Sequence, residues 1–223
     1  RLAVADLNKD GKADLLLTTN TRARNQLFTY LGKGDGTFAP PLASGPTGSW
    51  GWPELADLNG DGVLDVVAAS AGYAYVTLGK GDGTFETSGT SLSGISASLI
   101  AVGDVNGDGK RDVVKLSSSD STPLEIWPGK GDGSFDSPMR YAAVSAAQLT
   151  GMVVSDCDGD GKSDLIFTDA QGVLVRRGSM LSAGSRLMFP QRAASPALAD
   201  WNGDGVPDLV VSVGNGPAFA VLA

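Results

Sequence analysis

The chain has 223 residues, a formal net charge of −8, one cysteine and no histidine. Its acidic balance, and the absence of any run of about 18 apolar residues, predict neither nucleic-acid binding nor membrane insertion. A single cysteine excludes an internal disulfide framework, and the lack of histidine excludes the Ser-His-Asp, Cys-His and His-ligated zinc mechanisms.

The first predicted element is a short apolar segment that leads into an aspartate-rich loop. This loop, residues 6–14, has the sequence DLNKDGKAD. The same spacing of Asp, Asn or Asp, and Gly recurs at residues 57–65, 104–112, 156–164 and 200–208. Self-similarity with a period of about 45–50 residues indicates a repeat architecture.

A second, glycine-rich motif follows the first three aspartate loops. Its sequence is LGKGDGTF at residues 31–38 and 78–85, PGKGDGSF at 128–135, and it decays to RGSM at 177–180. The residue order differs from that of a phosphate-binding loop and no helix follows, so we interpret the motif as a hairpin turn. We expect its aspartate to stabilise the turn and its phenylalanine to pack between units; these phenylalanines are Phe38, Phe85 and Phe135.

Short segments rich in β-branched residues flank the aspartate loops. In the third unit, residues 99–102 precede the loop and residues 113–116 follow it. A further run, such as residues 75–78, leads into the glycine-rich motif, and a weaker segment starts near its phenylalanine. Four short strands in each unit predict an all-β fold, a β-propeller of four-stranded antiparallel blades.

We predict a single propeller domain over residues 1–223, with five visible repeat units of which the last is incomplete. The units span approximately residues 1–50, 51–97, 98–149, 150–194 and 195–223. Because an open sheet edge invites pairing, we expect further blades or a second chain to close the ring.

Each aspartate loop carries the ligand set of a calcium site. Positions 1, 3 and 5 offer side-chain oxygens, position 7 offers a backbone carbonyl, and the closing Asp at position 9 can be bidentate. Hard oxygen ligands in this number favour Ca²⁺ over Mg²⁺ and Zn²⁺. The predicted ligands of the five sites are Asp6, Asn8, Asp10, Lys12, Asp14; Asp57, Asn59, Asp61, Val63, Asp65; Asp104, Asn106, Asp108, Lys110, Asp112; Asp156, Asp158, Asp160, Lys162, Asp164; and Asp200, Asn202, Asp204, Val206, Asp208.

The loops differ from an EF-hand and recur too often to be turns alone. An EF-hand closes with Glu at position 12, where this chain has other residues. Asp, Asn and Gly also favour turns without any metal, but five copies of one ligand spacing argue against that interpretation. The loops hold 16 of the 25 acidic residues, and five Ca²⁺ would change the formal net charge from −8 to +2. Folding is therefore expected to be coupled to metal.

The two motifs together resemble the FG-GAP repeats, also called VCBS repeats, over nearly the whole chain. Similar repeats form the seven-bladed head of integrin α subunits, secreted bacterial surface proteins, and some fungal and bacterial lectins. The resemblance implies that the aspartate loop lies between the first two strands of each blade. It also implies calcium on one face, ligands on the opposite face or between blades, and possible membership of a seven-bladed ring.

One segment stands out as a candidate ligand site, the Gly-rich stretch around Trp50, Trp52 and Glu54. Two indole rings beside a carboxylate suit stacking on a sugar ring and hydrogen bonding to its hydroxyls. The alternative is that one or both Trp side chains pack between blades. We expect Trp201 and Cys157, at position 2 of their loops, to be packing residues.

We expect a secreted or cell-surface recognition module, lectin-like or adhesive, that binds a glycan or a protein away from the calcium loops. The runner-up is a non-catalytic structural propeller in a larger secreted enzyme or surface protein. Catalysis in this chain is not expected, because the carboxylates outside the two motifs show no recurring pair of the kind that glycosidases use.

Overall fold

The computed structural model describes residues 2–18, 26–47, 50–70, 73–92, 99–116, 124–141, 149–178, 181, 185–188, 193–203, 207–214 and 218–222. These residues form short antiparallel sheets in which each strand pairs with the next strand of the chain. Among them, no helix has the length and apolar character needed to span a bilayer.

Four of the sheets are complete blades and a fifth is described with three strands. The first three blades consist of β1 (Leu2–Ala5), β2 (Asp14–Thr18), β3 (Leu27–Tyr30), β4 (Leu42–Ser44); β5 (Pro53–Ala56), β6 (Asp65–Ser70), β7 (Tyr73–Thr77), β8 (Thr90–Leu92); and β9 (Leu99–Gly103), β10 (Asp112–Leu116), β11 (Leu124–Trp127), β12 (Met139–Tyr141). The last two consist of β13 (Gly151–Ser155), β14 (Asp164–Asp169), β15 (Gly172–Arg176), β16 (Ser185–Met188); and β17 (Ala193–Ala199), β18 (Asp208–Val213), β19 (Ala218–Leu222).

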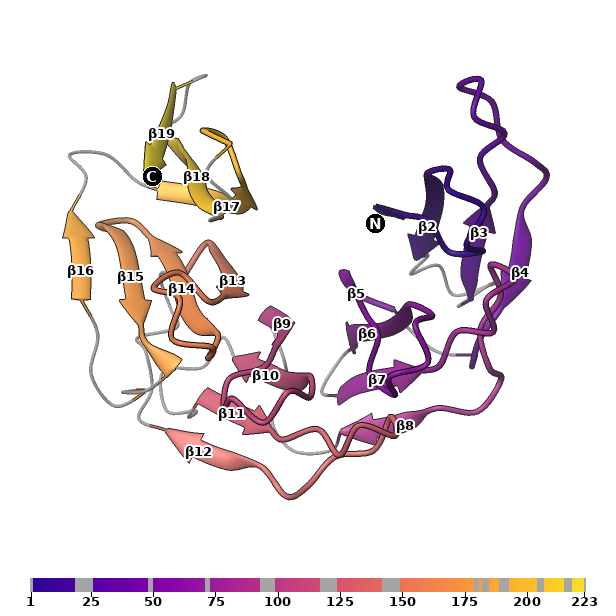
Figure 1. Ribbon diagram of the computed structural model, residues 1–223, viewed down its shortest axis with the longest axis horizontal. Coiled ribbons are helices and arrows are strands. Elements are labelled where there is room, and N and C mark those ends of the chain that lie inside the picture. Colours follow the sequence, from indigo (N-terminus) through magenta and orange to yellow (C-terminus); the bar gives the residue numbers. More distant parts are fainter. Residues whose placement is uncertain are drawn as a thin grey trace.

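The blades follow one another around an arc (Figure 1). The first strands β1, β5, β9, β13 and β17 line its inner side, and the fourth strands lie on its outer side. The arc is open between the first sheet and the fifth (Figure 1). This arrangement of antiparallel four-stranded sheets confirms the all-β propeller predicted from the repeat.

Alternate residues of each strand face the two neighbouring blades. In β10, Val113 packs in the cluster shared with the second blade, whereas Val114 packs in the cluster shared with the fourth. The strands are therefore apolar on both faces, because period-two alternation sends successive side chains to opposite sides of a sheet. This explains why the sequence shows continuous apolar runs rather than alternating polar residues.

The phenylalanines of the glycine-rich motif behave differently along the arc. Phe85 is 2% exposed in the cluster between the first two blades, and Phe135 packs against the cluster between the second and third. Phe38 is 39% exposed. The prediction that all three phenylalanines plug between blades is thus wrong for Phe38, because no described sheet lies on that side of the first blade (Figure 1).

The fifth blade begins earlier than predicted. β17 starts at Ala193, so the expected unit boundary between residues 194 and 195 falls inside this strand. The strand contains Pro196 and a register shift between Ala194 and Ala197. Proline weakens a strand prediction because it cannot donate to the ladder, and here the irregularity accommodates it.

Candidate metal loops and ligand-binding surfaces

Position 1 of each loop organises the turn that follows it. Asp57 accepts hydrogen bonds from the backbone N–H of Gly60 at 2.7 Å and of Gly62 at 2.8 Å. Asp104 and Asp156 make the same pair of contacts in their loops. Gly62 has φ 76°, a left-handed conformation that glycine adopts without strain. The glycine at position 6 is therefore required by the turn.

Positions 3 and 5 continue this pattern. Asn59 accepts the Asp61 N–H at 3.1 Å, and Asp61 accepts the Val63 N–H at 2.7 Å. The hydrogen bond from the Val63 N–H lowers the pKa of Asp61, and the N–H of Lys12 lowers the pKa of Asp10 in the same way. These exposed carboxylates are thus held ionised with fixed orientations, as cation ligands need to be.

Position 9 has a role that the sequence did not suggest. Asp112 is fully buried, and it accepts the N–H of Val105 at 3.0 Å and of Gly129, in the glycine-rich motif, at 2.9 Å. Both carboxylate oxygens therefore have backbone partners. The first, second and fourth loops repeat this clamp, with Asp14, Asp65 and Asp164 each bonded to position 2 and to the glycine-rich motif.

The clamp joins two segments distant in sequence. The clamp holds the start of the second strand, the loop and the turn after the third strand together through hydrogen bonds that need no metal ion. Burial raises the pKa of Asp65 and of Asp112. The predicted metal ligand at position 9 is thus also a structural carboxylate in the core of each blade.

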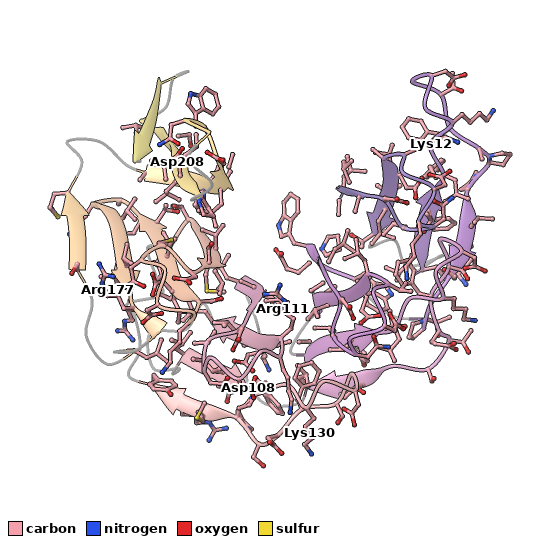
Figure 2. The ribbon with its side chains drawn as sticks, viewed as in Figure 1. Lys12, Asp108, Arg111, Lys130, Arg177 and Asp208 are labelled. Atoms are coloured by element: carbon pink, nitrogen blue, oxygen red, sulfur yellow. The ribbon has the colours of Figure 1, made fainter. Side chains whose placement is uncertain are left out.

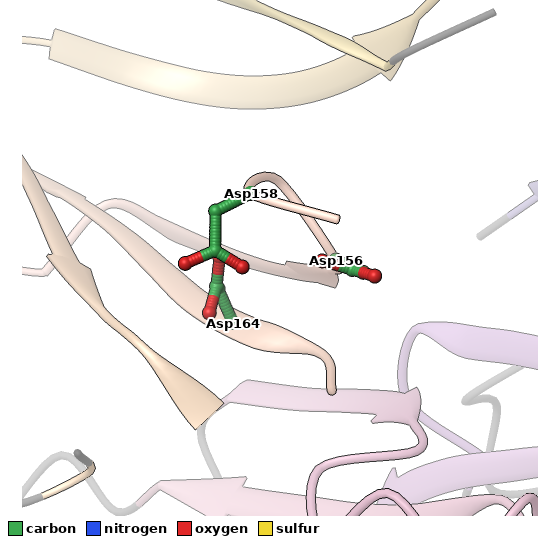
Figure 3. Close-up of side chains that lie close together, drawn as sticks. All are labelled: Asp156, Asp158 and Asp164. Carbon is green, nitrogen blue, oxygen red and sulfur yellow. The ribbon is translucent and has the colours of Figure 1, made fainter. Parts of the chain in front are cut away.

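The remaining donors fit a hard cation. In the fourth loop, one oxygen each of Asp156, Asp158 and Asp164 lies within 4.8 Å of the other two (Figure 3). Asp108 of the third loop and Asp208 of the fifth lie on separate blades of the arc (Figure 2), so each loop would hold its own ion. Carboxylate and amide oxygens around a tight Gly turn match the donor chemistry of Ca²⁺.

The fifth loop is described in part. Asp200 accepts the Gly203 N–H at 2.7 Å, and Asp208 accepts the Trp201 N–H at 2.7 Å, as in the other loops. The predicted ligands Asp204 and Val206 lie outside the described residues.

The structure separates the two candidate ligand-binding tryptophans. Trp50 is 2% exposed, packs beside Phe85 and donates its indole N–H to the Pro46 carbonyl at 3.2 Å. Trp50 is therefore a core residue, because the blade interface covers its ring, and a ligand cannot stack on it. Trp52, two residues on, is 59% exposed.

Glu54 follows on β5 and faces the third blade. Burial raises its pKa from 4.5 to about 7. Below pH 4.5 the side chain is neutral in the folded and unfolded states. As the pH rises through 4.5 to 7 the unfolded chain ionises first, so the stability contributed by the neutral buried carboxyl is progressively lost.

Glu54→Gln is therefore expected to stabilise the protein at pH 8 by about 2 kcal/mol and to have little effect at pH 4. Urea unfolding at both pH values in the presence of calcium measures the difference. Glu86→Gln, at an exposed site, is the matched control. An equal effect of Glu54→Gln at both pH values would contradict the raised pKa.

A groove lies between the second blade and the glycine-rich motif of the third. Its volume is about 340 Å³, and it is lined by Val76, Thr77, Leu78, Glu86, Ser88, Gly89, Thr90, Asp132, Gly133 and Ser134. The Ser134 hydroxyl donates to Asp132 at 2.5 Å and lowers the pKa of that carboxyl. The groove could not be predicted from the sequence, because its walls come from segments about 50 residues apart.

Comparison with known proteins places the repeat in a family. The FG-GAP-like repeat model matches residues 6–68, 57–115 and 104–167. The chain belongs to the FG-GAP-like repeat family. This membership confirms the resemblance carried by the aspartate loops. No curated protein sequence matches the chain.

Solved structures share the fold at low sequence identity. A Photorhabdus luminescens Tc holotoxin pore matches with TM-score 0.59 and 23% identity over 99% of this chain and 11% of that chain. An Agrocybe aegerita lectin, studied for recognition of non-reducing terminal N-acetylglucosamine, matches with TM-score 0.63 and 19% identity over 100% of this chain and 65% of that one. An exotype rhamnogalacturonan lyase matches with TM-score 0.56 and 14% identity over 99% of this chain and 46% of that chain. This FG-GAP-like chain therefore spans less than two thirds of the length of each of these three proteins.

Proposed function

We propose that this FG-GAP-like chain is a secreted, calcium-stabilised, non-catalytic module that recognises carbohydrate. Up to five Ca²⁺ are bound by the aspartate loops and stabilise the blades. Extracellular modules of this kind bind calcium at about 10⁻⁴–10⁻³ M, a range that extracellular calcium saturates. The metals are structural, and recognition occurs elsewhere on the blades.

The observation that carries recognition is the groove between the second and third blades. A volume of about 340 Å³ is enough for a sugar unit. Asp132 is an ionised acceptor of fixed orientation, and the hydroxyls of Ser88, Thr90 and Ser134 supply further donors and acceptors. Convergent hydroxyls and a carboxylate suit the many hydroxyls of a sugar better than an apolar ligand.

Thr90→Trp tests this site, because Thr90 is an exposed residue of the groove and a bulky ring there fills the space. On a glycan array in calcium, the variant is expected to lose at least tenfold in the binding signal of the wild-type chain. Trp52→Ala, at the opposite end of β5 from the aspartate loop, is the control for the second exposed surface. Loss of binding in Trp52→Ala alone would move the site to that surface.

The runner-up, a structural propeller within a larger secreted enzyme or surface protein, is distinguished by the same array. A folded, calcium-bound chain that binds no glycan favours this second function. The low shares of the toxin and lyase chains that are covered are consistent with propellers that form one part of a larger assembly.

We also propose that the open face of the first blade receives a further blade of the same repeat. Leu2 is 50% exposed, whereas Ile100 and Met152, at the same position of later blades, are each 8% exposed beneath the preceding blade. The turns agree: the Gly83 and Gly133 N–H groups donate to the Leu7 and Leu58 carbonyls of the preceding blade.

Gly36 is the equivalent residue of the first blade, and the space around it is open. Within the described part of the chain, no preceding blade supplies a carbonyl to its N–H. The apolar face of β1 and the turn N–H of Gly36 therefore match the surfaces that later blades use to contact the blade before them.

We take a second copy of the chain as the source of the further blade. Val4→Asp, which places a charge on the open face of the first blade, tests this docking. Wild-type chain is expected to associate reversibly with increasing concentration in sedimentation velocity, and Val4→Asp is expected to be monomeric with an unchanged melting temperature. Trp52→Asp, also at an exposed apolar residue, is the matched control. A wild-type chain that stays monomeric at all concentrations would contradict docking by a second copy.

A further inference from the structure

The fourth aspartate loop departs from the others at two positions that meet in space. Position 3 is Asp158, whereas the other loops have Asn there. The residue before the glycine that bonds to position 9 is Arg177, whereas the first three units have Leu31, Leu78 and Pro128. Both departures occur in the same unit.

The two departures form an ion pair. Arg177 Nη1 contacts Asp158 Oδ2, and Arg177 directly follows β15 (Figure 2). Asp158 also belongs to the group of three carboxylates that each have one oxygen within 4.8 Å of an oxygen of the other two (Figure 3). The guanidinium therefore approaches the carboxylates of the loop from a neighbouring turn.

Position 3 of the other loops is an asparagine, which can donate a hydrogen bond from its side-chain amide. Asn59 donates its amide to Asp61 at 2.9 Å, and Asn106 donates to Asp108 at 3.2 Å. An ionised Asp158 cannot donate and adds a negative charge beside other carboxylates, which repel at this range. Arg177 donates to Asp158 and supplies a positive charge that offsets the negative charge that Asp158 adds to the loop.

A cation from another segment distinguishes this loop from the first. There, Lys12 contacts Asp10 at 3.3 Å, but Lys12 belongs to the loop itself and also bonds Asp10 through its backbone N–H. Arg177 makes its contact without being part of the loop. It can leave the loop without any change in the loop backbone.

We propose that Arg177 is an exchangeable counter-ion of the fourth loop, an inference that rests on calcium binding as the proposed function. Without metal, Arg177 neutralises Asp158 and stabilises the fourth blade. When Ca²⁺ binds, its charge repels the guanidinium, which leaves for solvent. The fourth loop therefore binds calcium more weakly than it would with the Leu of the first two units, and its blade depends less on calcium.

The test uses calorimetric titration of calcium into the chelator-treated full chain, together with melting in EGTA. Asp156→Ala removes a ligand of the fourth loop alone and so assigns its step in the titration. Arg177→Leu is expected to raise the calcium affinity of this step about threefold to fivefold, and to lower the metal-free melting temperature. Arg177→Lys, which keeps the charge, is expected to stay near wild type.

Asp158→Asn restores the residue of the other loops and completes a double-mutant cycle. In that background Arg177→Leu is expected to change the affinity by less than about twofold, because the ion pair no longer exists. An unchanged fourth-loop step in Arg177→Leu, with calcium still bound by the other loops, overturns this inference alone. Absence of calcium binding in every loop overturns the proposed function as well.

Discussion

Removal of calcium is expected to lower the melting temperature of the chain by about 20 °C. With a Kd of about 10⁻⁴ M and about 2 mM calcium, each site contributes roughly 2 kcal/mol to folding, and five sites contribute roughly 9 kcal/mol. A domain of this size shifts by about 2–4 °C per kcal/mol. The physical reason is that each metal-free loop holds several carboxylates close together without a bound metal ion, and these carboxylates repel one another.

The measurement is thermal melting with 2 mM calcium, and with EGTA followed by excess calcium to show reversibility. Magnesium at the same concentration is the control, and it is expected to restore little, because Mg²⁺ keeps its waters and demands octahedral geometry. A melting temperature that is the same with and without chelator would show that the loops are turns rather than metal sites.

The fold could be predicted from the sequence because it repeats. One loop such as residues 57–65 is an ordinary Asp- and Gly-rich turn, whereas five copies between short apolar runs predict a propeller blade. The resemblance to FG-GAP repeats placed the loop after the first strand of that blade. The start of β17 could not be predicted, since Pro196 argues locally against a strand and the neighbouring blade decides the pairing.

The candidate site was predicted less completely. Trp50 and Trp52 lie two residues apart, and nothing in the sequence distinguishes which of them is buried. Packing of the second blade on the first buries Trp50 and leaves Trp52 exposed. The two walls of the groove come together through blade packing, which no local pattern records. Lys115 illustrates the same limit: it lies in an expected strand, yet it is fully buried 3.7 Å from Glu125, a partner that becomes its neighbour only through β10–β11 pairing.

The role of Asp112 is also set by contacts that form only in the folded blade. Its replacement is expected to have a large effect on the free energy of unfolding. Asp112→Ala is expected to reduce the free energy of unfolding by about 3 kcal/mol, measured by urea unfolding in EGTA so that no metal contributes. The substitution leaves the buried N–H groups of Val105 and Gly129 without acceptors, each at a cost of about 1–3 kcal/mol. Burial raises the pKa of Asp112, so removing the carboxylate also recovers part of its desolvation cost.

Asp112→Asn and Asp108→Asn separate the clamp from the metal. The first keeps the shape but turns one acceptor oxygen into a donor, so one side of the clamp fails and a loss of about 2 kcal/mol is expected. Asp108 is exposed and accepts the Lys110 N–H at 2.9 Å, so its substitution is expected to cost under about 1 kcal/mol in EGTA. In calcium, both variants also lose a predicted ligand, so both costs are expected to rise while Asp112→Asn stays the more destabilising. Equal costs in EGTA would instead mean that position 9 acts only through the metal.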